Sequence, residues 1–81
     1  MLQPVTALGL VAERRQEREL PPPKMARLIR EAAGVSQVRL ARELGVHRIS
    51  VVRWEAGLRV PRGELRRRYV TLLNALREDM Q

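Results

Sequence analysis

The chain of 81 residues contains no cysteine and no phenylalanine, and only one tryptophan, one tyrosine and one histidine. Without cysteine it forms no disulfide, no thiolate nucleophile and no cysteine-ligated zinc site. The single histidine, His47, cannot build a metal site without carboxylate partners, so we expect no metal and no other cofactor. With so few aromatic rings, aliphatic side chains must fill the core, which favours helices packed through apolar stripes.

Long apolar runs are missing as well. No stretch approaches the roughly 18 residues that would indicate a membrane span. Residues 5–12 are mildly apolar, but no basic residue precedes them, and Glu13 and Arg14 follow at once. We therefore expect no secretory signal, no membrane association and a cytoplasmic location.

Positive charge is concentrated in the middle of the chain. The net charge of the whole chain is +7. Residues 1–23 carry three Arg and three Glu and are neutral, whereas residues 24–63 carry one Lys and eight Arg against three Glu, a net charge of +6. Localised positive charge of this kind is typical of a surface that binds phosphates.

Helical periodicity predicts an all-α protein with about five helices. Residues 1–20 form a helical extension, with the helix itself over 7–19, and residues 21–81 form the main domain. Pro21, Pro22 and Pro23 separate the two, because proline stops the first helix and suits the first turn of the next. The helices expected after them span 23–33, 37–44, 47–55 and 62–78.

Two of the expected helices are predicted from stripes of apolar residues. In the helix over 23–33 we expect one face to hold Met25, Leu28, Ile29 and Ala32. In the last helix the stripe is longer and holds six apolar residues: Leu65, Tyr69, Leu72, Leu73, Leu76 and Met80. Spacings of three and four residues place such side chains on one face of a helix.

The segment 36–57 has the pattern of two short helices joined by a tight turn. Ser36 is a good N-cap for the first helix, and Gly45 supplies the left-handed residue that ends it. His47 opens the second helix, and Gly57 closes it. Two short helices joined by a tight glycine turn form a compact unit that fits the major groove of DNA.

The residues of this segment resemble a known family. The stretch SQVRLARELGVHRISVVRWEAGLRVP, residues 36–61, is similar to the helix-turn-helix of the Xre and Cro family of phage and bacterial repressors. The matching residues are Ser36, Gln37, Leu40, Ala41, Leu44, Gly45, Val46, Val51, Trp54, Glu55, Gly57 and Pro61. The resemblance implies a lambda-repressor-like bundle that binds double-stranded DNA in the cytoplasm of a bacterium or phage-infected cell, usually as a homodimer.

The resemblance also implies which residues touch DNA. The start of the second helix reads bases in this family, which selects Arg48, Ile49, Ser50 and Arg53. Arginine bonds the O6 and N7 atoms of guanine together, and an isoleucine contacts a thymine methyl group. The alternative for each Arg is a phosphate contact or a solvated charge with no role, and the alternative for Ile49 is burial.

Further residues are expected at the DNA backbone or inside the protein. The expected phosphate contacts lie around the two short helices: Lys24, Arg27, Gln37, His47, Arg59 and Arg62. The alternative for the side chain of Gln37 is a brace on the second helix. The resemblance suggests a partly buried salt bridge between Arg30 and Glu55. Residues 66–68 are three consecutive arginines, either a solvated helix face or a second nucleic-acid contact.

Three functions remain open on these observations. The leading one is a transcription regulator of repressor or Cro type, dimerising through the last helix (Leu72, Leu76, Met80) or the N-terminal helix. The second is an antitoxin-like or coactivator module, in which the neutral residues 1–20 bind a protein partner. The third is a phage recombination-directionality or architectural DNA-binding factor. Catalysis is not expected, because His47 and Ser50 lie three residues apart but nothing nearby completes a nucleophile system.

Overall fold

Helices account for most of the structure. The structure, a computed structural model, describes residues 19–79 of the 81. In this part lie α2 (Pro23–Ala32), α3 (Gln37–Leu44), α4 (Arg48–Glu55) and α5 (Gly63–Asp79), and no residue of it is in a strand. The all-α prediction is confirmed. The helix expected over 7–19 and the contribution of Met80 fall outside the described residues.

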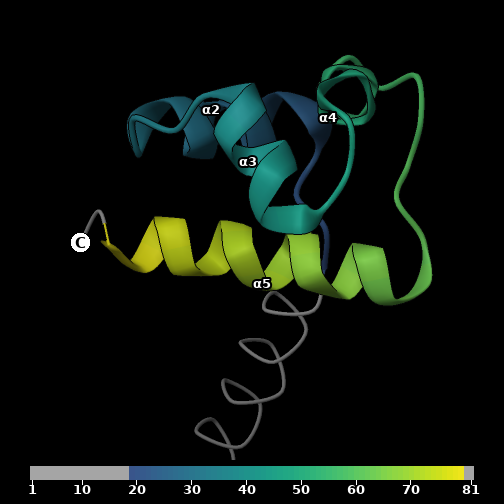
Figure 1. The fold of residues 1–81 in the computed structure, drawn as a ribbon. Coiled ribbons are helices and arrows are strands. Elements are labelled where there is room, and N and C mark those ends of the chain that lie inside the picture. The colour runs from purple at the N-terminus through teal and green to yellow at the C-terminus, as the bar shows by residue number, and fades with distance from the viewer. Residues whose placement is uncertain (1–18, 80–81) are drawn as a thin grey trace, which may run out of the picture.

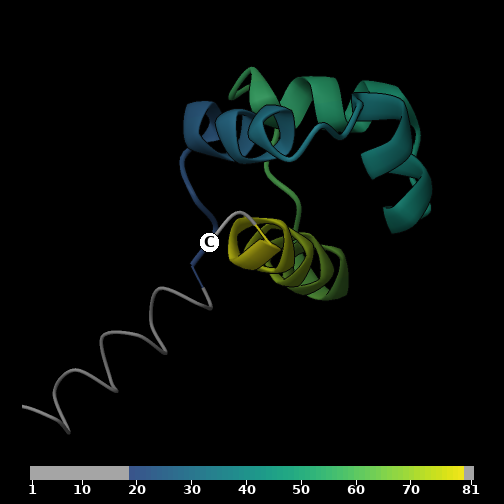
Figure 2. The ribbon, with the colours of Figure 1, turned by 90° about the vertical axis from the view of Figure 1, so that its left-hand side faces the viewer.

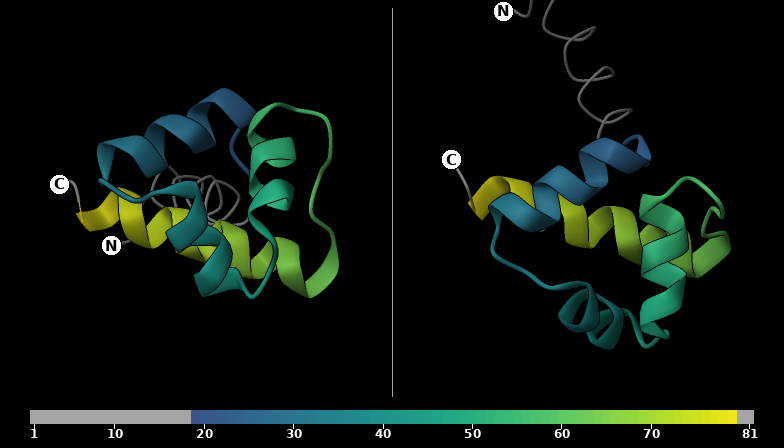
Figure 3. Two further views of the ribbon diagram at one scale, coloured as in Figure 1. Left: turned by 45° about the horizontal axis from the view of Figure 1, so that its top comes forward. Right: turned by 90° about the horizontal axis from the view of Figure 1, so that it is seen from above.

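The long helix α5 lies beneath the other three (Figure 1). Viewed nearly along its axis, α5 occupies one side of the molecule, and α2, α3 and α4 lie together on the other (Figure 2). The loop from α4 to α5 makes a wide excursion beside α4 before α5 begins (Figure 3). Helices α2 and α3 each contact α5, and α4 packs against α2 and α3.

Local signals set the ends of the two short helices. The Ser36 hydroxyl accepts a hydrogen bond of 3.0 Å from the backbone N–H of Arg39, which caps α3 as expected. Gly45 ends α3 with φ of 69°, a left-handed conformation that costs glycine nothing. The backbone N–H of Gly45 and that of Val46 return to carbonyls of α3 at 3.2 and 3.0 Å. The turn between α3 and α4 is thereby closed by backbone bonds alone.

The core lies where the four helices meet. Its buried members come from every helix: Ala26, Ile29, Leu40, Ala41, Leu44, Val51, Trp54, Tyr69 and Leu73. The two aromatic rings, Trp54 and Tyr69, lie with their centroids 4.9 Å apart. Val46 and Leu20 are partly buried against this cluster. Helices α3 and α4 contact each other through small and aliphatic residues of this cluster.

The buried face of α2 differs from the prediction. Ala26, Ile29 and Arg30 are buried, whereas Met25 and Leu28 are 46% and 59% exposed. Ala32 is exposed as well. The prediction was right for Ile29 and wrong for Met25, Leu28 and Ala32: periodicity alone selected the most apolar stripe, whereas the buried face of α2 includes Arg30, which meets a charged partner on α4. The buried pair of Arg30 and Glu55 therefore lies on the face of α2 that enters the core, and Met25 and Leu28 lie on the surface.

Candidate nucleic-acid interface

Helix α4 presents its first turn to solvent. Arg48 is exposed, Ile49 is 49% exposed, and Ser50 is half-buried. Arg53 is exposed one and a half turns further along. On the opposite side of the helix, Val51 and Trp54 enter the core. The alternative in which Ile49 is buried is therefore wrong, and all four side chains selected for base contact are accessible.

His47 precedes α4 instead of forming its first turn. Its backbone is extended, with φ of −75° and ψ of 147°, so His47 opens the segment 47–55 as its N-cap, as predicted, and the helix itself begins at Arg48. Its side chain makes no capping hydrogen bond, unlike that of Ser36. The imidazole is exposed. The backbone N–H of Ser50 donates to the carbonyl of His47 at 2.9 Å, so the first turn of α4 is closed by a backbone bond and not by a side-chain cap.

A buried ion pair joins α2 to the end of α4. Arg30 Nε donates to Glu55 Oε2 at 2.6 Å, and Arg30 Nη2 donates to Glu55 Oε1 at 2.9 Å. Arg30 Nη1 donates to the backbone carbonyl of Val35 at 2.8 Å. These hydrogen bonds to Glu55 raise the pKa of Arg30 in spite of its burial. The pair that the resemblance suggested is thus formed, with bidentate geometry.

Gln37 extends this ion pair to the start of α4. Its amide Nε2 donates to Glu55 Oε1 at 3.1 Å, which orients its Oε1 away from the carboxylate. That Oε1 accepts a hydrogen bond from Arg48 Nη2 at 3.4 Å. A continuous chain of contacts therefore runs from buried Arg30 through Glu55 and Gln37 to exposed Arg48. Of the two roles open to Gln37, the brace on α4 is present in the free protein.

A hollow of about 780 Å³ lies between α4 and the loop that follows it. Three arginines line it, Arg53 from α4 and Arg59 and Arg62 from the loop, together with Ser50. No acidic side chain lines the hollow, and the three guanidinium groups make no ion pair with any part of residues 19–79. The structure thus brings together a residue predicted to contact bases and two predicted to contact phosphates.

The remaining basic residues are less closely tied to α4. Lys24 and Arg27 are exposed on α2, and Arg27 forms an ion pair of 2.8 Å with exposed Glu31. The start of α2 abuts the end of α4, since a Cβ atom on Gly57 would lie 3.7 Å from Pro23 Cγ. On α5, Arg67 pairs with Glu64 at 2.6 Å. Arg68 donates to the backbone carbonyl of Glu43 at 3.2 Å, so part of the arginine run supports the fold.

Sequence reasoning missed the surroundings of Tyr69. Its side chain is 1% exposed, and its hydroxyl is a buried polar atom without a hydrogen-bond partner. Burial is the main cause that raises the pKa of Tyr69 to about 12, and the negative charge of Glu55 adds to it. The apolar stripe placed this ring in the core, but a pattern of residue types carries no signal for an unsatisfied hydroxyl.

These features agree with a comparison of the sequence with known families. The model of a helix-turn-helix family matches residues 27–77. The chain belongs to the Xre/Cro-type helix-turn-helix family. No curated protein and no solved structure matches it. Membership of this family implies DNA binding by a domain that is generally not an enzyme.

Two searches of the described residues found nothing further. Within residues 19–79, no group of three or more His, Asp or Glu side chains gathers where a metal ion would bind. Over the same range no helix has both the length and the apolar character that crossing a membrane requires.

Proposed function

We propose that this helix-turn-helix protein is a sequence-specific transcription regulator of the repressor or Cro type, with α4 as the recognition helix in the major groove of double-stranded DNA. The observation that carries the proposal is the exposed first turn of α4, braced from behind by the buried Arg30–Glu55 pair. A rigid helix with exposed polar and apolar side chains at its start is what direct readout of base edges requires.

Base recognition falls to the side chains on the exposed surface of α4. Arg48 and Arg53 each donate to the O6 and N7 atoms of a guanine, and Ile49 packs against a thymine methyl group. Ser50 donates to a base or a phosphate. Because Gln37 already holds the Arg48 guanidinium, Arg48 enters the groove with part of its rotamer freedom lost before binding.

The flanking residues hold the DNA backbone. Arg59 and Arg62 bind a phosphate at the hollow beside α4, and exposed His47 contacts another at the start of the helix. Lys24 and Arg27, from α2, and the start of α3 at Gln37 add further backbone contacts. These contacts set the register and affinity of the complex and carry no sequence information of their own.

The proposed assembly is a homodimer on a nearly palindromic operator. Residues 21–81 form the DNA-binding domain, and residues 1–20 are an extension that is available to a protein partner. Two copies related by a twofold axis would place their α4 helices about one DNA turn apart, about 34 Å. The protein works without a cofactor in the cytoplasm, where its DNA is found.

Selection from a random pool of DNA duplexes tests this proposal, with light scattering to measure the mass of the selected complex. We expect a palindromic motif bound by two chains. A non-palindromic motif bound by one chain, or by a filament, would favour a recombination or architectural factor. No enrichment at moderate salt would overturn sequence-specific binding, and a pull-down with residues 1–20 would then test the antitoxin-like or coactivator alternative.

A further inference from the structure

A pocket of about 200 Å³ lies between the segment that precedes α2 and the loop that follows α4. The segment crosses from the side of α5 to the start of α2, and it lines the pocket with Leu20 and the three prolines of residues 21–23 (Figure 2). The loop contributes Arg59, Val60 and Pro61. Most of this lining is apolar, and the space suits one small ring, since a cavity of about 150 Å³ is enough to hold benzene.

The walls of this pocket are held in place by the fold itself. The three prolines have fixed φ angles, which stiffens the segment before α2. On the loop side, the backbone N–H groups of Leu58 and Arg59 both donate to the carbonyl of Arg53, at 2.9 and 3.4 Å. Trp54 and Tyr69, which are 7% and 1% exposed, line the pocket from the core. A ligand would therefore meet a preformed site and would spend little free energy on ordering it.

Arg59 is the one charged residue of the lining. Its side chain is exposed, and it forms no ion pair with any residue of the described range 19–79. A planar guanidinium binds a carboxylate through two parallel hydrogen bonds. The second polar side chain of the lining is that of Tyr69, whose buried hydroxyl has no hydrogen-bond partner. The lining thus matches a molecule with a small apolar body and one carboxylate.

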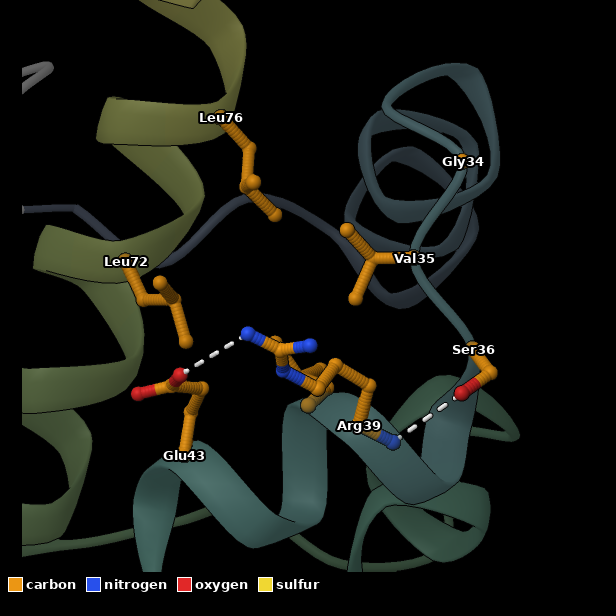
Figure 4. A pocket seen from close by; sticks show the side chains of 8 residues that line it. Gly34, Val35, Ser36, Arg39, Glu43, Leu72 and Leu76 are labelled. Carbon is orange, nitrogen blue, oxygen red and sulfur yellow. Dashed lines mark hydrogen bonds and ion pairs between the residues drawn. The ribbon is translucent and has the colours of Figure 1, made fainter.

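The larger hollow between α3 and α5, of about 600 Å³, lacks this combination. Figure 4 shows its arginine, Arg39, paired with Glu43 on the same helix, with Leu72 and Leu76 on α5 opposite them. The two charges are 3.6 Å apart. Because a neighbouring acid already neutralises Arg39, a carboxylate gains less attraction there than beside Arg59.

Arg59 also connects the pocket to the surface proposed to bind DNA. The hollow beside α4 and the pocket share four residues: Trp54, Arg59, Val60 and Pro61. A carboxylate in the pocket and a phosphate in the hollow would compete for one guanidinium, and the two anions would repel each other. Each ligand must then weaken the binding of the other by the same factor.

We infer that this pocket binds a small carboxylate with a single ring or a short alkyl chain, and that the bound ligand lowers the affinity of the protein for DNA. The apolar body of the ligand packs between the prolines and Trp54, and its carboxylate binds Arg59. The binding site is inferred from the pocket alone, whereas the effect on DNA rests on the proposed function.

Titration of the full chain, labelled with ¹⁵N, tests the site without DNA, and the probes are benzoate and hexanoate. We expect saturable shifts of the indole N–H of Trp54 and of the backbone N–H groups of Ala26 and Val60, which all line the pocket. The backbone N–H groups of Leu72 and Leu76, at the hollow between α3 and α5, should not move. Shifts confined to Leu72 and Leu76 would overturn the assignment to this pocket.

Variants of two exposed arginines separate the specific contact from the general positive charge. Arg59→Ala should bind benzoate about tenfold more weakly, because it loses hydrogen bonds to a charged group. Arg42→Ala removes an exposed arginine of α3 that does not line the pocket, and it should bind benzoate like the unmodified chain. Benzamide, which has the ring without the charge, should bind equally weakly to Arg59→Ala and to the unmodified chain. Circular dichroism verifies that both variants fold.

Fluorescence anisotropy on a random DNA duplex tests the effect on DNA. Saturating sodium benzoate should weaken binding relative to sodium chloride at the same concentration, and it should have no further effect on Arg59→Ala. Unchanged DNA affinity with benzoate bound would overturn the effector role. The site itself would be overturned if neither benzoate nor hexanoate gave saturable shifts, or if Arg59→Ala bound benzoate as well as the unmodified chain. A chain that binds no DNA would contradict the proposed function and leave the titration result standing.

Discussion

The carboxylate of Glu55 accepts two hydrogen bonds from the guanidinium of Arg30, at 2.6 and 2.9 Å, although 25 residues separate them along the chain. The two side chains are only 3% and 9% exposed. Removing charges from water is costly, and their mutual attraction offsets this cost only when the geometry is good and the remaining polar atoms are satisfied. Val35 and Gln37 supply those additional bonds.

Breaking this pair from one side should destabilise the protein strongly. Glu55→Ala leaves a buried, unpaired arginine, and we expect the free energy of unfolding to fall by about 3–5 kcal/mol. Urea denaturation followed by tryptophan fluorescence measures this loss. Glu31→Ala, which removes an exposed partner of Arg27, should cost less than about 1 kcal/mol. If Glu55→Ala unfolded at the same urea concentration as the unmodified protein, the Arg30–Glu55 pair would contribute nothing to the stability of the fold.

The brace on Arg48 makes a prediction about specificity. Gln37→Ala removes the acceptor that holds Arg48, so we expect weaker discrimination between the selected duplex and random DNA. Because the two residues act together, the effects of Gln37→Ala and Arg48→Ala should not add, whereas those of Gln37→Ala and Arg53→Ala should. Fluorescence anisotropy on both duplexes gives the double-mutant cycle. Strict additivity of the first pair would show that Gln37 acts independently of Arg48.

Base and phosphate contacts should separate by their dependence on sequence and salt. Arg48→Ala and Arg53→Ala should each reduce discrimination by about 1–3 kcal/mol. Arg59→Ala should weaken binding to all duplexes alike and lower the salt dependence by about one phosphate contact. Titrations at several salt concentrations distinguish the two patterns. Equal losses on every duplex for all three variants would indicate a general DNA clamp without base readout.

The buried hydroxyl of Tyr69 should reduce stability at high pH. The folded-state pKa is raised from 10 to about 12, so the phenol stays protonated in the fold while it ionises in the unfolded chain. Stability is therefore fully present below pH 10 and declines as the pH rises toward 12. Tyr69 is the single tyrosine of the chain, so tyrosinate absorbance reports this ionisation directly. Ionisation near pH 10 in the folded protein would contradict the prediction.

Tyr69→Phe tests the same hydroxyl at neutral pH. Since the hydroxyl has no partner, its removal should leave the free energy of unfolding unchanged or raise it by about 1 kcal/mol. The ring contact with Trp54 is retained. Urea denaturation at neutral pH gives the value, and the loss of stability between pH 10 and 12 should also disappear. A loss of more than about 1 kcal/mol at neutral pH would mean that the hydroxyl is satisfied in solution.

The amino-acid sequence by itself determined where the helices begin and end. Ser36 caps α3 and Gly45 turns the chain toward α4, because capping and a left-handed conformation depend on one residue and its immediate neighbours. The family, the aliphatic core between α3 and α4, and the excess of positive charge around them also follow from local residue types and spacing. The sequence also placed His47 at the opening of the recognition helix, where the structure has it as the N-cap.

The tertiary structure alone decided which side chains meet. It buried Arg30 in place of Met25 and Leu28 on α2, and it exposed Ile49. It gathered Arg53, Arg59 and Arg62 around one hollow and linked Gln37 to Arg48. These outcomes depend on how each helix is rotated about its own axis and on distances between segments far apart in the chain. Helical periodicity defines a stripe but does not choose its partner, and a buried ion pair outweighed the more apolar choice.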